Sequence, residues 1–268
     1  MYEMITSSSN SIIKEVKSLY RKKDRWMKKN FFVEGIRAVR ECVDSNANIA
    51  YLVYSDMLFS INGGKELLDK ISQENYNINY ISDKLFNEIS DTEKPQGILA
   101  VVSYDLKKID EIIKDKENFL ILLDRVQDPG NMGTIIRTAD AFGSNGIIVT
   151  EGCVDIFNPK TIRSTMGSIF HIPLLYYKSA CEAIKDLKDR GITVITTSLD
   201  ANEYCFDVDF KRNFALIIGN EASGVSNEII ADSDLLIKIP MPGEAESLNA
   251  AIASSVIMYE VLRQRLKF

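Results

Sequence analysis

Apolar side chains recur along the chain in two spacings that predict alternating strands and helices. In the second half, helical spacing, for example over residues 180–190, separates most of the short apolar runs. Buried strands alternating with helices predict a mainly parallel sheet with both faces covered. Such sheets bind ligands beyond the carboxyl ends of their strands. The predicted strands are 119–123, 146–150, 193–197, 214–218 and 235–239.

The first 105 residues show the same alternation on a smaller scale. Residues 10–29 have the apolar spacing of one basic amphipathic helix, and the short apolar segment 31–33 precedes a second helical pattern. Further patterns predict strands at 49–54 and 98–104 and a helix at 64–71. We therefore predict a small α/β domain at 1–105, a charged linker at 106–118 and a second α/β domain at 119–268.

Composition and charge narrow the class of protein. With 46% hydrophobic and 26% charged residues, the chain is typical of a globular protein. The start lacks a signal sequence, and no apolar run approaches the length of a membrane helix, which predicts a cytoplasmic protein without a membrane partner. The net charge is -6, yet residues 14–40 hold ten basic residues against three acidic ones. This asymmetry indicates either a polyanion-binding end or simply a solvated helix face.

The residues that commonly form metal sites or nucleophilic dyads are sparse. Cys42, Cys153, Cys181 and Cys205 form no C-x-x-C pair, and His171 is the only histidine. We therefore predict reduced thiols and no metal. A G-x-S-x-G sequence is absent, which disfavours a serine hydrolase. No G-x-G-x-x-G follows a predicted strand, which disfavours a nicotinamide-dependent oxidoreductase.

The first of three informative turns follows the predicted strand 119–123. Its residues 128–131 contain proline and glycine, and we expect Asn131 to cap the helix that follows. Arg137 lies six residues further on, where its side chain can lean back toward the turn and hold a phosphate. Taken alone, Arg137 is explained more simply as an exposed arginine on an amphipathic helix.

Two further turns follow later strands. Gly219 and Gly224 flank a turn that allows close backbone approach to a ligand and places the Glu221 carboxylate at the strand end. Taken alone, these glycines are explained more simply as a plain left-handed turn. After the strand at 235–239, a loop stiffened by prolines leads to Ser247, the predicted N-cap of a long helix. The apolar stripe of this helix predicts a core contact or a dimer seam, formed by Leu248, Ile252, Ser255, Tyr259 and Leu262.

In this order and spacing, the three turns closely resemble the motifs of the SpoU (TrmH) family of RNA methyltransferases, in the SPOUT superfamily. The first motif, N-x-G-x-x-x-R, is present as Asn131, Gly133 and Arg137, and the second, G-N-E-x-x-G, begins at Gly219. The third, I-P-M-x-G-x-x-x-S-L-N, is present as Ile239, Pro240, Met241, Gly243, Ser247, Leu248 and Asn249. A weaker resemblance at 32–35 and 95–100 is to the substrate-binding domain of many members, which is similar to small RNA-binding ribosomal proteins.

The resemblance implies a fold and an activity. It implies a trefoil-knotted parallel-sheet catalytic domain preceded by a small α/β RNA-binding domain, a homodimer, and S-adenosylmethionine as methyl donor. The implied reaction is 2'-O-methylation of a ribose in structured RNA, in ribosomal RNA more than in transfer RNA. Alternatives are a transfer RNA ribose methyltransferase, a SPOUT enzyme acting on a base nitrogen, which the third motif disfavours, and a catalytically silent RNA-binding or ribosome-assembly factor.

The resemblance also implies site residues, and the basic segment adds candidates for RNA binding. The implied catalytic positions are Asn131, Arg137, Glu221, Ser247 and Asn249. The implied cofactor-binding positions are Thr196, Thr197, Gly219, Asn220, Ile239, Met241, Ser247 and Leu248. The expected RNA-binding residues of the basic segment are Lys22, Lys23, Arg25, Lys28, Lys29 and Arg37. Residues 158–167 resemble the RNA-facing loop of the family, which adds Lys160 and Arg163.

Overall fold

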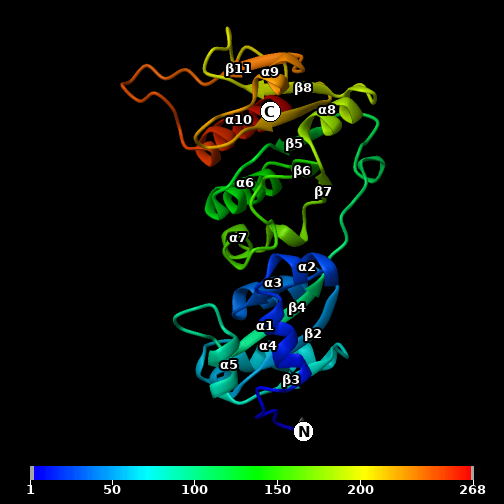
Figure 1. The fold of residues 1–268 in the computed structure, drawn as a ribbon, viewed down its shortest axis with the longest axis vertical. Helices are drawn as coiled ribbons and strands as arrows, with labels where there is room; N and C mark the ends of the chain where they lie inside the picture. Colours follow the sequence, from blue (N-terminus) through cyan, green and yellow to red (C-terminus); the bar gives the residue numbers. More distant parts are fainter. Residues whose placement is uncertain (1–2, 267–268) are drawn as a thin grey trace. The chain divides into compact units, whose positions relative to one another are not determined.

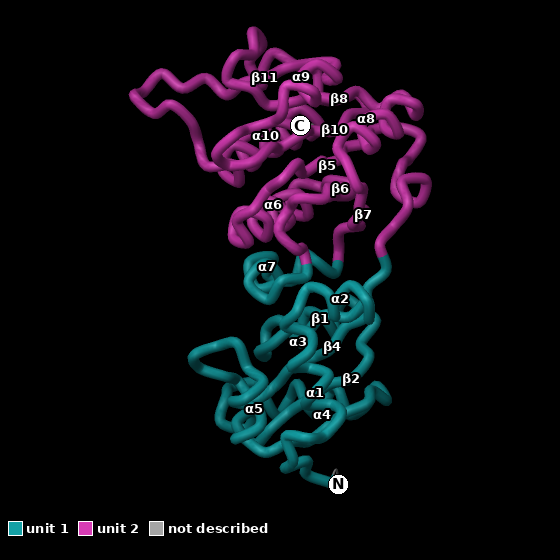
Figure 2. The backbone as a smooth tube through the Cα atoms, in the orientation of Figure 1, with its two compact units in different colours: residues 1–105, 157–170 teal, residues 106–156, 171–268 magenta. Residues whose placement is uncertain are grey.

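The computed structural model describes residues 3–266 and forms two compact units (Figure 2). The first unit runs to Asp105 and includes Phe157–Phe170, and the second combines Leu106–Ile156 with the chain from His171 onward. We expected residues 157–170 in the second domain, but this segment packs with the first unit. We expected residues 106–118 to be a linker, yet Ile109 and Ile112 are buried in the core of the second unit.

The first unit is built on a four-stranded mixed sheet in the order β1-β4-β2-β3. β4 pairs antiparallel with both β1 and β2, and β2 pairs parallel with β3. The predicted strands at 49–54 and 98–104 are confirmed, and the apolar segment at 31–33 forms the middle of β1. The bounds are β1 (Asn30–Glu34), β2 (Ile49–Tyr54), β3 (Ile78–Tyr80) and β4 (Ile98–Ser103).

Helices cover this sheet on both sides. The helices are α1 (Ser11–Ser18), α2 (Lys22–Lys28), α3 (Ile36–Asp44), α4 (Gly64–Gln73), α5 (Asp83–Ile89) and α7 (Pro159–Thr165). Apolar residues of α1 and α5 form one core with the sheet, while α3 packs against α4, β1 and β4. α7 contacts β1, and the 3-10 segments are η1 (Asp56–Ser60) and η3 (Ser168–Phe170).

The predicted single helix at 10–29 is wrong, because the chain breaks between α1 and α2. Arg21 is extended at the break, with φ -91° and ψ 128°. The Arg25 side chain is only 2% exposed, and its Nη1 donates to the Leu19 carbonyl oxygen at 2.6 Å. An arginine that bonds the terminal carbonyls of α1 stabilises that helix end and fixes the turn into α2.

The second unit is built on a seven-stranded parallel sheet in the order β7-β6-β5-β10-β8-β11-β9. Because neighbouring strands run the same way, the carboxyl ends of β5, β10, β8 and β11 meet at one edge of the sheet. All five predicted strands are confirmed to within one residue. The bounds are β5 (Phe119–Leu123), β6 (Gly146–Thr150), β7 (Leu174–Tyr177), β8 (Thr193–Thr197), β9 (Glu203–Tyr204), β10 (Phe214–Ile218) and β11 (Leu235–Lys238).

Helices also cover this sheet. α8 (Ala180–Lys188) and α9 (Asn227–Ala231) share one apolar core with alternate residues of β5 and β10, together with the 3-10 segment η2 (Ile109–Glu111). α6 (Pro129–Ala141) and α10 (Ala250–Arg265) pack against each other, and α6 contacts β6 (Figure 1). The Thr138 and Ser255 hydroxyls, 3.2 Å apart, join α6 to α10. None of the helices described is long and apolar enough to cross a membrane.

Candidate active site

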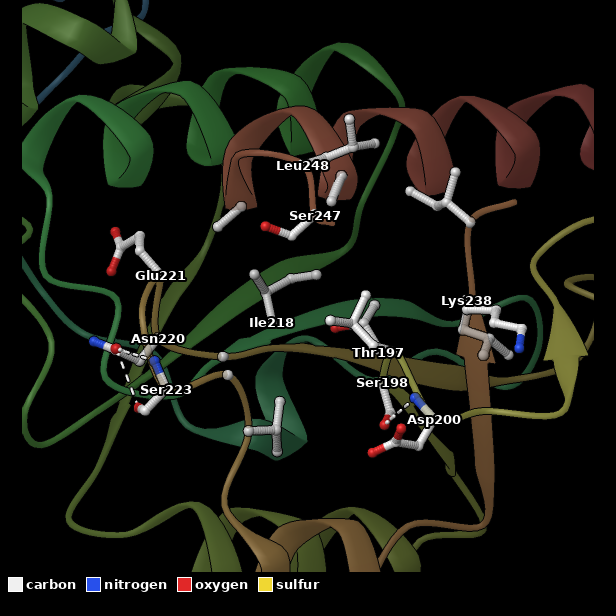
Figure 3. A pocket seen from close by; sticks show the side chains of 18 of the residues that line it. Thr197, Ser198, Asp200, Ile218, Asn220, Glu221, Ser223, Lys238, Ser247 and Leu248 are labelled. Atoms are coloured by element: carbon white, nitrogen blue, oxygen red, sulfur yellow. Dashed lines mark hydrogen bonds between the residues drawn. The ribbon is translucent and has the colours of Figure 1, made fainter. Parts of the chain in front are cut away.

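A cavity of about 450 Å³ lies at the carboxyl ends of β8, β10 and β11, and we call it the strand-end cavity (Figure 3). Its walls come from the segments after these three strands and from the start of α10. Both polar and apolar side chains line it, among them Thr197, Ile218, Ser247 and Leu248. This is the edge at which parallel sheets bind ligands, and the volume suits a small organic molecule.

A chain of hydrogen bonds joins the three turns beside this cavity. The Asn131 Nδ2 donates to Glu221 Oε1 at 3.0 Å, and the Asn249 Nδ2 donates to Asn131 Oδ1 at 2.9 Å. Asn131 lies 90 positions from Glu221 and 118 positions from Asn249 in the sequence. The convergence that the three motifs imply is therefore present in the structure, with Asn131 at its centre.

The turn after β10 is held in a tight conformation by its own polar groups. The Asn220 Oδ1 accepts from the backbone N–H groups of Ala222 and Ser223, each at 3.0 Å, and its Nδ2 donates to the Arg125 carbonyl at 2.9 Å. A Cβ on Gly219 would lie 2.6 Å from backbone atoms of Gly224 and of the next residue. Glycine is therefore required at 219 for the turn to close upon itself.

The Glu221 carboxylate is held by three donors. Its oxygens accept from the backbone N–H groups of Gln127 and Asp128, at 3.1 and 3.0 Å, as well as from Asn131. Partial burial raises the pKa of this carboxyl, but the hydrogen bonds from Asn131, Asp128 and Gln127 outweigh it and leave the pKa below its ordinary value. Glu221 is therefore ionised at neutral pH and orients Asn131 instead of exchanging protons.

Replacing the Glu221 carboxylate with an amide should destabilise the fold at neutral pH. Glu221→Gln replaces one accepting oxygen with an amide donor that faces a backbone N–H, so we expect a lower melting temperature at pH 7. Because the folded-state pKa is depressed, the stabilisation by Glu221 is present above the ordinary carboxyl pKa and is lost as pH falls through the lowered one. Thermal melts from pH 7 to pH 3 should show the gap to wild type closing. A pH-independent gap would contradict this, and Glu66→Gln, at an exposed glutamate, is the control.

Two expected helix caps are wrong by a few residues. The N-cap of α6 is Asp128, whose Oδ1 accepts from the Asn131 backbone N–H at 2.8 Å, and Asn131 lies within the first turn. The N-cap of α10 is Asn249, whose Oδ1 accepts from Ala251 and the next backbone N–H, whereas Ser247 precedes the helix and lines the cavity. Because Asp128 and Asn249 act as the N-caps, the Asn131 side chain and the Ser247 hydroxyl are available for other contacts.

Some of the other predicted site residues line the strand-end cavity and some do not. Thr196 does not line the cavity, because its side chain is buried and its Oγ1 lies 2.6 Å from the Ser233 Oγ. Arg137 is exposed on α6, with no hydrogen bond or ion pair to its side chain from the described residues. The predicted cofactor positions that do line the cavity are Thr197, Gly219, Asn220, Ile239, Met241, Ser247 and Leu248.

Sequence reasoning missed several lining residues. Ser198 and Asp200 follow β8 directly, so the rule that ligands bind beyond strand ends could have found them. Asn227 and Ile230 lie on the short helix α9, which no sequence signal placed beside the cavity. Lys238 ends β11 and contributes a cation to the wall, with its Nζ 5.6 Å from the centre of the Tyr204 ring.

The cysteines and the histidine take no part in this site. All four cysteines are free thiols. Burial raises the pKa of the Cys42 thiol to about 12, which leaves it unreactive. The His171 Nδ1 lies 3.0 Å from the Asp140 Oδ2, away from the cavity lining. Within residues 3–266, no group of three or more potential ligands could hold a metal ion.

The expected RNA-binding residues lie in the first unit, and the prediction for one of them is wrong. Arg25 is buried and bonded to a backbone carbonyl, so it cannot contact RNA as an exposed cation. Arg163 is exposed and pairs with Asp91 at 2.7 Å. The remaining candidates are exposed cations: Lys22, Lys23, Lys28, Lys29, Arg37 and Lys160.

The apolar stripe on α10 faces outward, not into the core. Ile252 is 55% exposed and Tyr259 is 57% exposed, while the buried face of α10 carries other residues such as Ile257 and Met258. Phe142 of α6 contacts Tyr259 edge-on, with the ring centres 6.1 Å apart. Of the two predictions for this stripe, the core contact is wrong and the dimer seam stays a prediction.

Comparison with known proteins matches both parts of the chain. Residues 118–259 match the SpoU rRNA Methylase family, and residues 10–100 match the MRM3-like substrate binding domain. The 23S rRNA (guanosine(2553)-2'-O)-methyltransferase RlmP of Bacillus subtilis is 33% identical over 97% of this chain and 99% of its own. The 23S rRNA (uridine(2479)-2'-O)-methyltransferase of Streptomyces viridochromogenes is 36% identical over 88% of this chain and 83% of its own.

Solved structures agree with the sequence relatives. The AdoMet-bound rRNA methyltransferase from Sinorhizobium meliloti superposes with a TM-score of 0.87 at 31% identity, covering 99% of both chains. The SpoU methyltransferase AviRb from Streptomyces viridochromogenes, in complex with the cofactor AdoMet, superposes with a TM-score of 0.84 at 31% identity, covering 96% of this chain and 99% of its own. With the three motifs joined at one strand-end cavity, this chain belongs to the SpoU rRNA methylase family.

Proposed function

We propose that this chain transfers the methyl group of S-adenosylmethionine to a ribose 2'-oxygen in ribosomal RNA. The observation that carries the proposal is the hydrogen-bonded chain from Asn249 through Asn131 to Glu221, which joins the three family motifs beside the strand-end cavity. Two relatives that match this chain over 99% and 83% of their own length are named 23S rRNA 2'-O-methyltransferases.

The strand-end cavity has the composition that this methyl donor needs. Apolar walls from Ile218, Ile237 and Leu248 suit an adenine ring, and the close turn at Gly219 leaves backbone groups facing the space. Asp200 and Glu221 offer carboxylates to a cationic amino acid group, and the Ser247 hydroxyl also lines the cavity. When bound, S-adenosylmethionine supplies an electrophilic sulfonium methyl group to the attacking oxygen.

Arg137 is proposed to bind the phosphate next to the target ribose. A guanidinium presents several N–H donors in a fixed fork and no acceptor, so Arg137 is suited to hold a phosphate with two parallel hydrogen bonds. The same positive charge stabilises the negative charge that develops on the 2'-oxygen as its proton passes to solvent water. Arg137 is free for this task, because nothing among the described residues pairs with its side chain.

Asn131 is proposed to position the ribose. Glu221 and Asn249 each engage one end of its side-chain amide, so the amide has a single orientation before substrate arrives. A fixed polar group beside the cavity holds the attacking oxygen close to the methyl carbon, and such positioning removes a large part of the entropic barrier. The Ser247 hydroxyl, which is exposed at the cavity wall, is placed to add a second contact.

The proposal includes a homodimer assembled through the outward face of α10. Ile252, Val256 and Tyr259 form an exposed apolar surface on this helix, and α6, which carries Arg137, packs beside it. A second copy covering this surface would bury it and bring Arg137 toward the strand-end cavity of the partner. The family resemblance implies both this pairing and a trefoil knot in the catalytic domain.

The dimer gives the second prediction. Ile252→Glu places a charge in the proposed seam, so we expect a monomer in sedimentation equilibrium and a loss of methyl transfer of at least tenfold. The exposed Met4 of the first unit provides the control, since Met4→Glu adds the same charge outside the seam. A wild-type chain that sediments as a monomer, or a monomeric Ile252→Glu variant with full activity, would refute this pairing.

The first unit favours ribosomal RNA over transfer RNA. A solved structure that concerns the 2-OH methylation of C/U34 on tRNA superposes on only 55% of this chain, with a TM-score of 0.51. That match includes 97% of the other protein. The relatives named for 23S rRNA extend over both units. A ribosomal RNA substrate would place the chain in the cytoplasm.

Mapping ribose methylation in cells tests this function. Ribosomal and transfer RNA are compared between cells with and without the gene for this chain, at nucleotide resolution. We expect one 2'-O-methyl position in ribosomal RNA to disappear and to return with the wild-type gene. Loss of a transfer RNA position instead would support the alternative substrate. Unchanged methylation with a ribosome-assembly defect would support a catalytically silent factor.

A further inference from the structure

A second cavity, of about 560 Å³, lies within the first unit between β1, α3 and the segment 159–170, and we call it the α3–α7 pocket. It takes no part in the proposed methyl transfer. Much of its wall is apolar, formed by Phe32, Ala38, Ile162, Met166, Ile169 and Phe170. Such a volume with apolar walls can enclose a planar heterocycle.

One polar group points to a ligand in the α3–α7 pocket. The Gln96 Oε1 accepts from the Ile36 backbone N–H at 2.8 Å, which fixes the orientation of the side-chain amide. Its Nε2 makes no hydrogen bond within the described part of the chain. Gln96 therefore offers a fixed donor to a carbonyl or ring nitrogen inside the pocket, which are the acceptors that nucleobases carry.

The charge around the pocket favours a polyanion. The lining contains the cations Arg37, Arg40, Lys94 and Arg163 against the carboxylates Glu34 and Glu41. The Glu34 carboxylate is occupied internally, because it accepts from the hydroxyls of Ser90 and Thr92 and from the Asp91 backbone N–H. Arg37 and Lys94 are exposed and form no ion pair with any described residue. Phosphates would find free cations at the rim.

The backbone at the outer wall is held in an unusual conformation. Met166 and Gly167 have φ values of 52° and 100°, so two successive residues are left-handed. A Cβ on Gly167 would lie 2.4 Å from the Glu41 Cγ, which shows how closely this turn packs on α3. The turn leaves the Met166 side chain 56% exposed while it lines the pocket. A polarisable, exposed side chain at this position can pack on an aromatic base.

We propose that the α3–α7 pocket binds one unpaired nucleotide of the RNA substrate, with the base inside and the flanking phosphates on Arg37 and Lys94. The apolar walls would enclose the base, the Gln96 amide would donate to it, and the cations would hold its backbone. The inference rests on the proposed RNA substrate, and it assigns to the first unit a preference for RNA that presents an extruded base. A paired helix cannot insert a base into such a cavity, so the pocket selects for structure and not only for charge.

Binding of two matched RNA hairpins to the full-length chain tests this. One hairpin carries a single bulged 2-aminopurine nucleotide, and the other has the same stem without the bulge. We expect the wild-type chain to bind the bulged hairpin about tenfold more tightly, as expected for one stacked base, and to change the 2-aminopurine fluorescence. Ala38→Trp fills the pocket, so it should abolish both the preference and the fluorescence change while the affinity for the paired hairpin stays the same.

Two further variants keep the test decisive. Ala50→Trp adds the same side chain at an exposed position outside the pocket and should behave as wild type. If Ala38→Trp does not fold, Met166→Gly replaces it, because glycine tolerates the left-handed backbone while removing one wall, and it should reduce the preference several-fold. Equal binding of the two hairpins by wild type, or a preference that survives in folded Ala38→Trp, would overturn the proposal.

This outcome is separable from that of the proposed function. Hairpin binding needs no methyl donor. If the chain prefers the bulged hairpin yet transfers no methyl group, the nucleotide-binding pocket is supported and the proposed reaction is refuted. If the chain methylates ribosomal RNA yet binds both hairpins equally, the proposed reaction is supported and nucleotide binding in the pocket is refuted.

Discussion

Replacing Arg137 with alanine is expected to reduce single-turnover methyl transfer by about 10²- to 10³-fold, which corresponds to about 3–4 kcal/mol of lost transition-state stabilisation. The fold should be unaffected, since the side chain is exposed and no described residue pairs with it. Affinity for the methyl donor should also stay unchanged, because Arg137 is proposed to bind the RNA phosphate and not the donor. Rapid-quench transfer of a tritium-labelled methyl group measures the rate.

Arg137→Lys distinguishes the two roles that a cation can have here. A lysine keeps the charge but loses the forked pair of hydrogen bonds, so we expect it to recover only a small part of the lost rate. Lys185→Ala, which removes an exposed cation from α8, is the matched control and should leave the rate unchanged. Near-full activity in Arg137→Lys with unchanged RNA affinity would contradict the phosphate-binding role.

The second large effect is expected at Gly219. An alanine Cβ there would lie 2.6 Å from backbone atoms on the opposite side of the turn, so the turn must open. We expect Gly219→Ala to weaken donor binding by at least tenfold and to lower the free energy of unfolding by about 1–3 kcal/mol, as overpacking does. Titration calorimetry with S-adenosylmethionine and urea denaturation measure the two quantities.

Gly243 supplies the matched control for this substitution. It lies in the loop before α10, and a Cβ added there would meet no atom within 4 Å. Gly243→Ala should therefore bind the donor nearly as wild type does. If Gly219→Ala and Gly243→Ala bind the donor equally well, the closed turn after β10 is not part of the donor site.

The local elements were largely predictable from the sequence, whereas their spatial order was not. Runs such as Phe119–Leu123 and Phe214–Ile218 are entirely buried, and consecutive apolar residues directly predict strands of that kind. Their adjacency in the sheet depends on contacts between segments about 95 residues apart, which local spacing does not encode. That the three turns meet at one site was predictable only from the family resemblance of their motifs.

The wrong predictions have local physical causes. The basic segment 14–40 predicts Arg25 as an RNA contact, but the Leu19 backbone carbonyl at the end of α1 holds the Arg25 guanidinium inside. Asn131 and Ser247 both have good N-cap chemistry, yet Asp128 and Asn249 take those positions. Several residues near each helix start can cap it, and tertiary contacts decide which one does. For Asn131, the deciding contact is the bond to Glu221.

Ribose methylation by this chain is tested by a single-turnover reaction with the purified protein, tritium-labelled S-adenosylmethionine and 23S rRNA from cells that lack this protein. After complete nuclease digestion, we expect label in one 2'-O-methylnucleoside, at about one methyl group per RNA molecule. Label on a base, or no transfer by a chain that binds both the donor and the RNA, would contradict it.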